Sequence, residues 1–444
     1  MSFRDNLIKA RSHIIFLVAL AAGLGLVVTL ENVISQSPGG EQAMGRSAAM
    51  MAFDAVTPLP VAIAGVSSAE DLAHARIAWR YFQNNTNPKT GFANSVDKYP
   101  STTMWEMGSY FVAVVAADRL GIIEPAEARV RIGLALDTLA GVRLFDDILP
   151  NKAYNVETGE LVDYANKPVE RGLGWSALDI SRLIATLGQV EANYPDLSGK
   201  VAKVMARWDL LQMVEGGQLI GGNMIEGELR RDQEGRVGYG QYAAKAMMLY
   251  GYDMYSAYNA AEHLMVREVQ GQPIPVDDRL HRNVTPAFAV SEPYVFDGLE
   301  FGFDARSHRF ATAIYLAQEA RFRETGLLTA VSETHLDQKP YFAYASVWGG
   351  GEPWAVISFR GERLDSMRTL ATKTAFAWYA LFGTDYARQL VAKVAPLGDA
   401  ERGWAEGIYE IDGKTNTSVT LNTNAIILAA LAFRAHGPLI KAEK

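Results

Sequence analysis

The chain has 444 residues, of which 49% are hydrophobic and 21% are charged, and these proportions describe a globular protein long enough for one large domain or two of ordinary size. Its net charge of −8 argues against a general nucleic-acid binder, since phosphate contacts need clustered lysine and arginine. The absence of cysteine excludes disulfides, cysteine nucleophiles and thiolate metal sites.

The N-terminal segment predicts a membrane anchor. Arg4, Lys9 and Arg11 precede a stretch over residues 12–30 that lacks Asp, Glu, Lys and Arg. At about 1.5 Å per residue, this stretch just spans a hydrocarbon core of about 30 Å. The apolar part of a cleavable signal peptide is only about 7–15 residues long, so we favour an uncleaved anchor over a cleaved signal. Because the basic flank stays in the cytoplasm, we expect a single-pass inner-membrane protein whose main domain lies in the periplasm.

The segment after the anchor predicts a linker. We expect residues 1–34 to form the cytoplasmic tip and the anchor, and residues 35–66 to form a flexible tether. The tether sequence mixes Gly, Pro, Ser and Ala without sustained periodicity, as linkers do.

From residue 67 onwards the sequence indicates helices of two kinds. "SSAEDLAHARIAWRYFQNN" (67–85) begins with a serine cap and has a broad apolar face. "MWEMGSYFVAVVAADRLG" (104–121) consists mainly of small and apolar residues, whereas "EPAEARVRIGLALDTLAGV" (124–142) is amphipathic. This alternation recurs about six times, which predicts two concentric layers of helices. We therefore expect an all-α (α/α)6 toroid over residues 67–444, with an irregular helical bundle as the alternative.

Short β hairpins are expected in the loops of the toroid. The stretches "GGQLIGG" (216–222), "FAYASVWGG" (342–350) and "PWAVISF" (353–359) have the composition of hairpin strands and turns. They would decorate one end of the helical ring.

The loops that lead into the small-residue helices share aromatic rings and acids. Rings that pack on sugar C–H faces, together with carboxylates that bond to hydroxyls, suit a carbohydrate ligand, although core packing also explains each ring taken alone. We predict that these side chains gather at one mouth of the toroid and bind substrate: Trp105, Tyr294, Trp175, Tyr239, Trp348, Trp354, Asp97, Glu170 and Asp179.

The stretch "EPYVFDGLEFGFDA" (292–305) is the strongest candidate for chemistry. On one continuous helix, Asp297, Glu300 and Asp304 would share a face, and the last two would repel each other if both were charged and unpaired. A nearby arginine could pair with them, a bent loop could separate them, or one acid could keep its proton.

A retained proton is what glycoside hydrolysis requires, since a general acid protonates the leaving oxygen while a second carboxylate acts as base or nucleophile. We therefore predict catalytic roles for Glu300 and Asp297, with substrate binding or structure as the alternative. Glu106, beside Trp105 at the start of a small-residue helix, is the third catalytic candidate.

Other templates are not matched. The sequence has no HExxH motif and its seven histidines are scattered, so we expect no histidine-built metal site. It has no GxSxG elbow, no P-loop lysine in its glycine-rich stretches, and no Rossmann fingerprint after a strand. We expect no cofactor.

Four stretches together resemble a bacterial family, domain of unknown function 3131: "ARIAWRYFQNNTNPKTGFANSV", "TTMWEMGSYFVAVVAADRLGII", "ERGLGWSALDISRLI" and "EPYVFDGLEFGFDARS". The resemblance covers about residues 67–435. It implies a glucoamylase-like (α/α)6 fold and, because the family tends to accompany polysaccharide synthesis genes, a carbohydrate-active envelope protein. It assigns no catalytic residue.

Three functions follow as hypotheses. The first is a glycoside hydrolase that acts on a glucan or exopolysaccharide outside the inner membrane. The second is a non-catalytic polysaccharide-binding or scaffold subunit of a synthase complex. The third is a polysaccharide lyase, which the acidic chain disfavours because a lyase must neutralise a uronate. The expected partners are a polysaccharide, the inner membrane and a synthase complex, with no nucleic acid.

Overall fold

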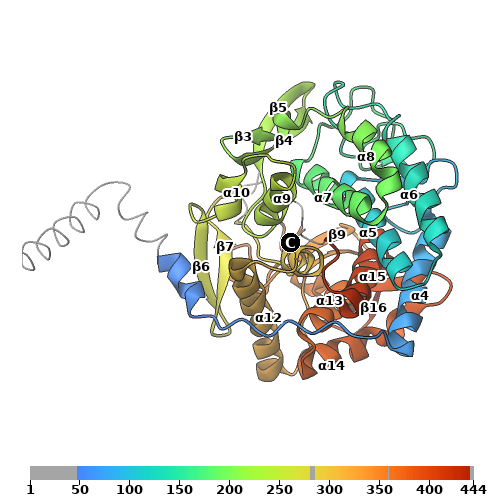
Figure 1. Ribbon diagram of the computed structural model, residues 1–444. Coiled ribbons are helices and arrows are strands. Elements are labelled where there is room, and N and C mark those ends of the chain that lie inside the picture. Colours follow the sequence, from blue (N-terminus) through green and yellow to red (C-terminus); the bar gives the residue numbers. More distant parts are fainter. Residues whose placement is uncertain (1–47, 281–285, 359, 441–444) are drawn as a thin grey trace, which may run out of the picture. The chain divides into compact units, whose positions relative to one another are not determined.

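The computed structural model describes residues 48–280, 286–358 and 360–440 (Figure 1). The predicted anchor and the first part of the predicted tether lie outside these residues. Within the described ranges, no helix is long and apolar enough to cross a membrane. The chain divides into two units, residues 1–52 and residues 53–444, and the account below concerns the second.

Six helices of the described residues form an inner ring. Each contacts the next in chain order, and the last contacts the first, so the ring closes. The ring consists of α5 (Met104–Arg119), α7 (Ala177–Asn193), α9 (Tyr239–Met248), α11 (Glu292–Phe296), α13 (Thr372–Phe382) and α15 (Leu421–His436). A π-helical turn, η3 (Asp297–Phe301), continues α11.

A second set of helices packs on the outside of this ring, and the labels in Figure 1 show most of them at its periphery. The outer set consists of α4 (Ala69–Asn85), α6 (Pro125–Leu139), α8 (Ser198–Met205), α10 (Tyr255–Asn259), α12 (Ala305–Thr325) and α14 (Asp385–Val394). The two layers give the mainly helical toroid that the sequence predicts.

The composition of each helix explains its layer. Helix α5 is buried on all sides from Met107 to Ala117, which is expected of a helix that is apolar all round. A Cβ atom at Gly108 would lie 3.2–3.3 Å from α7, so the missing side chain lets the two inner helices approach closely. The outer helix α4 has a capping box between Ser68 and Asp71, which confirms the predicted serine cap.

Short antiparallel strands decorate the loops, as expected. They are β1 (Ser101–Thr102), β2 (Tyr154–Asn155), β3 (Val214–Glu215), β4 (Gln218–Ile225), β5 (Glu228–Glu234), β6 (Leu264–Val269), β7 (Gln272–Asp277), β8 (Glu333–His335), β9 (Phe342–Ala345), β10 (Trp348–Gly349), β11 (Glu352–Pro353), β12 (Val356–Ser358), β13 (Thr369–Ala371), β14 (Gly398–Asp399), β15 (Gly403–Tyr409) and β16 (Thr415–Val419). The pairing is β1–β2, β3–β4–β5, β6–β7, β8–β9–β12, β10–β11, and β13, β14 and β16 on β15.

Two regions differ from the sequence prediction. The first is "YDMYSAYNAAEHLMV" (252–266), whose pattern predicts one of the amphipathic helices, but α10 ends at Asn259 because Ala260 adopts a left-handed φ of 56°. The chain then forms the β6–β7 hairpin, whose turn residues Gln270 and Gly271 both have positive φ, as a two-residue hairpin turn requires. The sequence pattern of these strands is too short to outweigh the neighbouring helical pattern.

The segment before α4 is packed against the toroid. Phe53 is buried and its ring lies 4.4 Å from that of Phe310. Ala62 donates its N–H to the Leu381 carbonyl at 2.7 Å, near the C-terminal end of α13. Although the sequence predicts a tether as far as residue 66, we place the beginning of the folded domain at residue 53.

Candidate active site

The N-terminal ends of the inner helices meet at one end of the ring, which we call the mouth. Each inner helix places one polar or ionisable residue in its first turn there: Glu106, Asp179, Tyr239, Glu292, Lys373 and Asn422. Strands β8, β9 and β15 add Glu333, His335, Tyr344 and Glu406. The mouth is therefore rich in carboxyl groups.

Asp179 is the first of two half-buried acids at the mouth whose pKa is raised to about 8. Its side chain is half-buried. Burial, followed by the nearby Glu234 and Glu106, raises the pKa of Asp179 to about 8. Glu234 is held in place because it accepts hydrogen bonds from the Ser176 hydroxyl at 2.9 Å and from the Ala177 amide at 2.6 Å. Asp179 therefore keeps its proton at neutral pH.

Glu333 is the second perturbed acid. It lies on β8, is half-buried, and faces the same mouth. Burial and the Glu292 charge raise the pKa of Glu333 to about 8, and the charge of Asp179 adds to the effect. The cation of Lys373 and the hydroxyl of Tyr239 act in the opposite direction and favour the ionised form.

Below these two acids lies a floor of buried ionisable residues, Glu292, Lys373 and Glu406. Glu292 is fully buried and forms an ion pair with the almost fully buried Lys373. Glu406 is also buried, and it accepts hydrogen bonds from the hydroxyls of Thr420 and Thr423. Burial lowers the pKa of His335 to about 4, so this ring is neutral at pH 7.

A chain of hydrogen bonds extends from this floor through the centre of the ring. Asn422 donates to Glu292 at 2.7 Å, and the Ser109 hydroxyl donates to Asn422 at 3.0 Å. Arg182 donates to Ser109 at 3.2 Å and to Glu300 at 3.0 Å.

The chain ends where the Tyr242 hydroxyl donates to Glu300 at 2.6 Å. Together with Lys373, this network contains a residue from every inner helix, with Glu300 on η3 beyond α11. It places hydrogen-bonded polar groups in the interior of the ring, although one guanidinium nitrogen of Arg182, Nη2, has no hydrogen-bond partner there.

The structure separates the predicted catalytic carboxylates Glu300 and Asp297 from the mouth. Glu300 has no solvent exposure and is paired with Arg182, whose guanidinium also lies 3.7 Å from the centre of the Phe296 ring. Asp297 is buried and lies 2.5 Å from the Lys245 ammonium. Burial raises the pKa of Asp297 although Lys245 opposes this. We correct both assignments, because neither carboxyl can reach a substrate.

The expected helical face is also interrupted. The π-helical turn ends at Gly302, which has a φ of 84°, and Asp304 instead caps α12 by accepting from the Ser307 amide at 2.8 Å. Burial would raise the pKa of Asp304, but Lys245 and its hydrogen bonds lower it to about 2. The repulsion anticipated between Glu300 and Asp304 is thus relieved by a bend and by separate cations.

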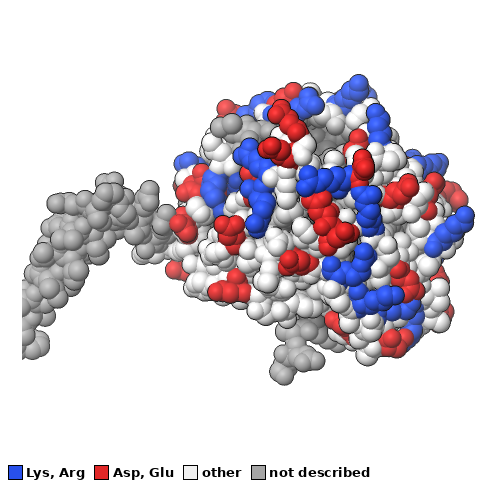
Figure 2. Space-filling view, turned by 90° about the horizontal axis from the view of Figure 1, so that it is seen from above, with Lys and Arg blue, Asp and Glu red and all other residues white. Residues whose placement is uncertain are grey.

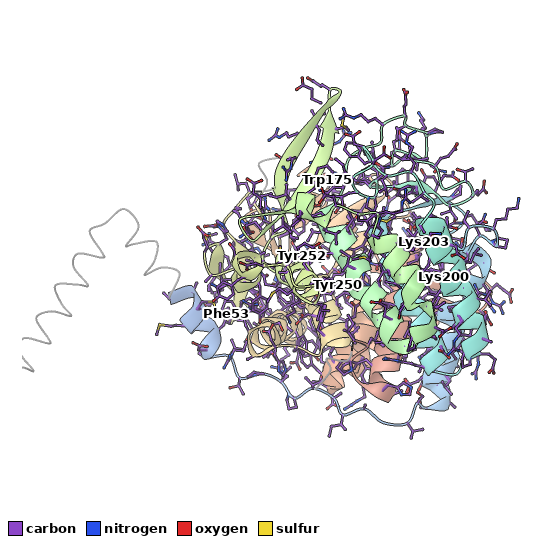
Figure 3. The ribbon with its side chains drawn as sticks, turned by 45° about the horizontal axis from the view of Figure 1, so that its top comes forward. Phe53, Trp175, Lys200, Lys203, Tyr250 and Tyr252 are labelled. Atoms are coloured by element: carbon purple, nitrogen blue, oxygen red, sulfur yellow. The ribbon has the colours of Figure 1, made fainter. Side chains whose placement is uncertain are left out.

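The predicted aromatic contacts divide into two groups. Trp105, Trp175 and Tyr294 are buried in the helical core. Figure 3 shows Trp175 at the foot of the β4–β5 hairpin, where its indole N–H donates to the Ile220 carbonyl at 2.9 Å. The half-exposed rings are Tyr239, Trp348 and Trp354. Arg267 lies over the Trp348 ring at 5.5 Å and Arg321 over the Trp354 ring at 5.2 Å.

The remaining predicted acids lie in different surroundings. Glu106 is half-buried at the mouth and accepts a hydrogen bond from the hydroxyl of its helix cap, Thr103. Asp97 forms an ion pair of 3.0 Å with Arg402. Glu170 is exposed, and the neighbouring Arg171 pairs with Asp146 rather than with it. Among the acids predicted from the sequence, Glu106 and Asp179 lie near each other at the mouth.

Sequence reasoning missed Glu333, Lys373 and His335. Glu333 and His335 lie on a three-residue strand, and Lys373 is the second residue of an apolar helix. A lysine that precedes a long apolar stretch is a detectable signal for a buried cation, whereas so short a strand leaves almost none. Within the described ranges, no group of three or more His, Asp or Glu residues has the arrangement of a metal site.

Comparison with solved structures identifies the same fold in carbohydrate-active enzymes. An endo-β-1,2-glucanase from Chitinophaga pinensis, in complex with sophorotriose and glucose, has a TM-score of 0.61 and 10% identity over 84% of this chain and 94% of that one. An endo-β-1,2-glucanase from Talaromyces funiculosus with sophorose has a TM-score of 0.55 and 12% identity over 84% of each chain. A protein from Bacteroides caccae, named provisionally as a glucoamylase, has a TM-score of 0.57 and 13% identity over 83% and 93%.

At these identities the likeness shows the fold alone, and it confirms a helical toroid of the glucoamylase and β-1,2-glucanase kind. No curated protein matches the sequence. The family model described as "Protein of unknown function (DUF3131)" matches residues 73–437, most of the chain, which confirms the resemblance stated above. This chain therefore belongs to the DUF3131 family.

Proposed function

We propose that this protein is a glycoside hydrolase that cleaves a neutral glucan, with Asp179 as general acid and Glu333 as general base. The observation that carries the proposal is the presence, at one mouth, of two half-buried carboxyl groups whose pKa values are raised to about 8. Perturbed carboxyl pairs of this kind are what glycoside hydrolysis requires.

The neighbours of each acid support the division of roles. Two coupled carboxyl groups lose their protons in successive steps, so over a range of pH one is ionised while the other is not. We assign the ionised role to Glu333, because the buried ammonium of Lys373 and the hydroxyl of Tyr239 favour its charged form, against burial and the Glu292 charge. We assign the protonated role to Asp179, because after burial its strongest neighbours are the acids Glu234 and Glu106.

In the proposed reaction, the Asp179 carboxyl gives its proton to the glycosidic oxygen as the bond from that oxygen to the anomeric carbon breaks. A water molecule attacks the anomeric carbon and passes its proton to Glu333. The products are two shorter glycans, and one water is consumed. The two carboxyl groups exchange charge state during the reaction and are restored by proton transfer with solvent.

The charge of the mouth supports a neutral substrate. The carboxyl groups of Glu106, Asp179, Glu234 and Glu333 outnumber the cations near them, and the main cation, Lys373, is already paired with Glu292. A uronate would be repelled, which disfavours the lyase hypothesis. The two endo-β-1,2-glucanases with this fold were solved in complex with sophorotriose and glucose and with sophorose, so β-1,2-glucan is the first substrate to test.

We further propose that residues 12–30 anchor the protein in the inner membrane and that the toroid acts in the periplasm. The length of the uncharged stretch and its basic flank support this topology. Trimming or release of an exopolysaccharide as it is synthesised would suit this position.

The test is reducing-sugar release from β-1,2-glucan and α-1,4-glucan by the full-length protein, beside Asp179→Asn and Glu333→Gln. Each variant should lose at least about 100-fold in kcat with little change in Tm. Glu170→Gln, which neutralises an exposed acid, is the matched control and should remain fully active.

A rescue experiment assigns the roles. A substrate with an activated leaving group should restore turnover to Asp179→Asn, because such a group departs without a proton, but not to Glu333→Gln. Glycan binding by the wild type without any turnover would refute hydrolysis and favour the scaffold hypothesis, while full activity in both variants would refute the site.

A further inference from the structure

A second concavity opens beside the mouth. Its volume is about 410 Å³, within the range of about 300–1,000 Å³ typical of small-ligand sites. One wall is the loop around Tyr164 that precedes α7, and the other is the tip of the β4 strand, including Asn223 and Met224. The Lys152 side chain also lines the pocket, and its ammonium donates a hydrogen bond to the Asn223 side chain.

The walls of this pocket are held in place by hydrogen bonds. The Asp163 carboxylate accepts from the backbone N–H groups of Ala165 and Lys167 at 2.9 and 2.8 Å, which shapes the loop. The Tyr99 hydroxyl donates to the Tyr164 carbonyl at 3.1 Å. On the opposite side, Met224 donates its N–H to the Leu173 carbonyl at 3.0 Å. The pocket is thus largely formed before any ligand binds.

The pocket and the mouth are neighbours. The Lys152 charge is among those that act on Asp179, and the Tyr164 hydroxyl is among those that act on Tyr344 of β9. Loop and hairpin both border the N-terminal end of α7, since Trp175 and Gly222 exchange backbone hydrogen bonds at 3.1 and 2.9 Å. A chain molecule bound at Asp179 could therefore extend into the pocket.

The lining is amphipathic in the way that a sugar ring is. Leu173, Met224 and Ile225 give apolar surface, and the Tyr164 side chain, 65% exposed, offers a ring face. Polar groups lie beside them. Among the described lining residues, Lys152 and Asp163 carry one charge of each sign, so these residues give no net positive charge for a phosphate or a uronate.

We propose that this pocket is an accessory subsite that binds a neutral sugar residue of the glycan chain, several residues from the bond that is cleaved. The inference rests on the proposed function for the position of the scissile bond. It makes the enzyme favour long chains, because binding energy gained at a remote residue is lost when the substrate is truncated.

The experiment compares the full-length wild type with Tyr164→Ala and Tyr164→Phe on β-1,2-glucan polymer and on the shortest β-1,2-linked oligosaccharide that is hydrolysed. Tyr164→Ala should lower kcat/KM about tenfold on the polymer, the scale of one ring contact, and leave the short substrate within about twofold. Tyr164→Phe keeps the ring and should behave as wild type. The matched control is Tyr255→Ala, which removes a ring that is 64% exposed on α10.

An unchanged ratio of polymer to short-substrate kcat/KM in Tyr164→Ala would overturn the subsite while leaving the proposed hydrolase intact. If the wild type hydrolyses no glycan, the proposed function fails, and the subsite is then tested by retardation of the protein in gels that contain β-1,2-glucan. Loss of retardation in Tyr164→Ala but not in Tyr255→Ala would support it, and equal retardation of all variants would overturn it.

Discussion

Replacing Glu300 by glutamine distinguishes a structural from a catalytic role for this residue. Gln is nearly isosteric and can still accept the hydrogen bond that Tyr242 donates at 2.6 Å. It carries no charge, however, so the Arg182 guanidinium loses its counter-ion while remaining fully buried among the Trp105, Tyr242 and Phe296 rings.

The size of the effect follows from the geometry. Opposite charges 3.0 Å apart attract by about 5 kcal/mol at an effective dielectric constant of about 20. The retained hydrogen bonds and the ring contacts of Arg182 offset part of this loss. Removal of one partner of a buried ion pair destabilises proteins by about 3–5 kcal/mol, and we expect Glu300→Gln to lie in that range. In a domain of this length, Tm should fall by about 4–6 °C.

The assay is thermal and urea unfolding of the wild type, Glu300→Gln, Arg182→Met and the double variant, each beside its rate of glucan hydrolysis. The double variant leaves no unpaired charge in the interior, so it should be more stable than Arg182→Met alone. Asp137→Asn is the control, because its exposed ion pair with Lys200 on α8, labelled in Figure 3, should contribute less than about 1 kcal/mol.

The reasoning is refuted if Glu300→Gln keeps the wild-type Tm and loses hydrolysis at least about 100-fold. That result would make Glu300 the catalytic acid that the sequence pattern suggests, and would show that the interior of the ring opens to substrate. A lowered Tm with turnover retained below the transition would instead confirm a structural ion pair.

Three further outcomes follow from the structure. Hydrolysis should decline as pH rises through about 8, because Asp179 then loses its proton. The folded pKa values of Asp179 and Glu333 are raised, so the stability that these acids contribute is complete below about pH 4 and is lost toward pH 8. The Tm of Asp179→Asn should therefore vary less between about pH 5 and 9 than that of the wild type. Protein beginning at residue 67 should melt below protein beginning at residue 53, because burial of Phe53 alone stabilises by about 1.5–3 kcal/mol; equal Tm values would restore the predicted tether. Trp175→Ala should destabilise by about 3–5 kcal/mol in urea unfolding, and a loss of glycan binding at unchanged stability would return this ring to the binding surface.

The helical layers could be predicted from the sequence because each layer has its own composition. Buried all-round helices such as α5 consist of small and apolar residues, while α4 and α6 show a polar face. The cap at Ser68 is equally local, since it depends on a serine and an acid three residues apart. Patterns within one helix are thus sufficient for the ring.

The candidate site is harder to predict from the sequence, because the residues that pair with one another there come from distant parts of the chain. Glu300 pairs with Arg182, 118 residues away, and Glu292 with Lys373, 81 residues away. No local pattern shows that these acids face a cation. The π-helical turn after α11 adds to the difficulty, because Glu300 in this turn pairs with Arg182, whereas Asp297 and Asp304 share the Lys245 ammonium.

Acids beside aromatic rings therefore have two different roles in this fold, and the groups around each carboxyl determine which role it has. In the interior, Glu300 is paired with a cation and donors, its charge is satisfied, and a proton there could not reach solvent. At the mouth, Asp179 is half-buried, and burial and the neighbouring acids raise its pKa to about 8, as the proposed role of general acid requires. The hydrogen bonds that run from Glu292 through Asn422, Ser109 and Arg182 join the helices that carry Glu106 and Asp179. Paired acids thus hold the inner helices together, and the proposed function assigns the chemistry to the acids of the mouth that lack a cation.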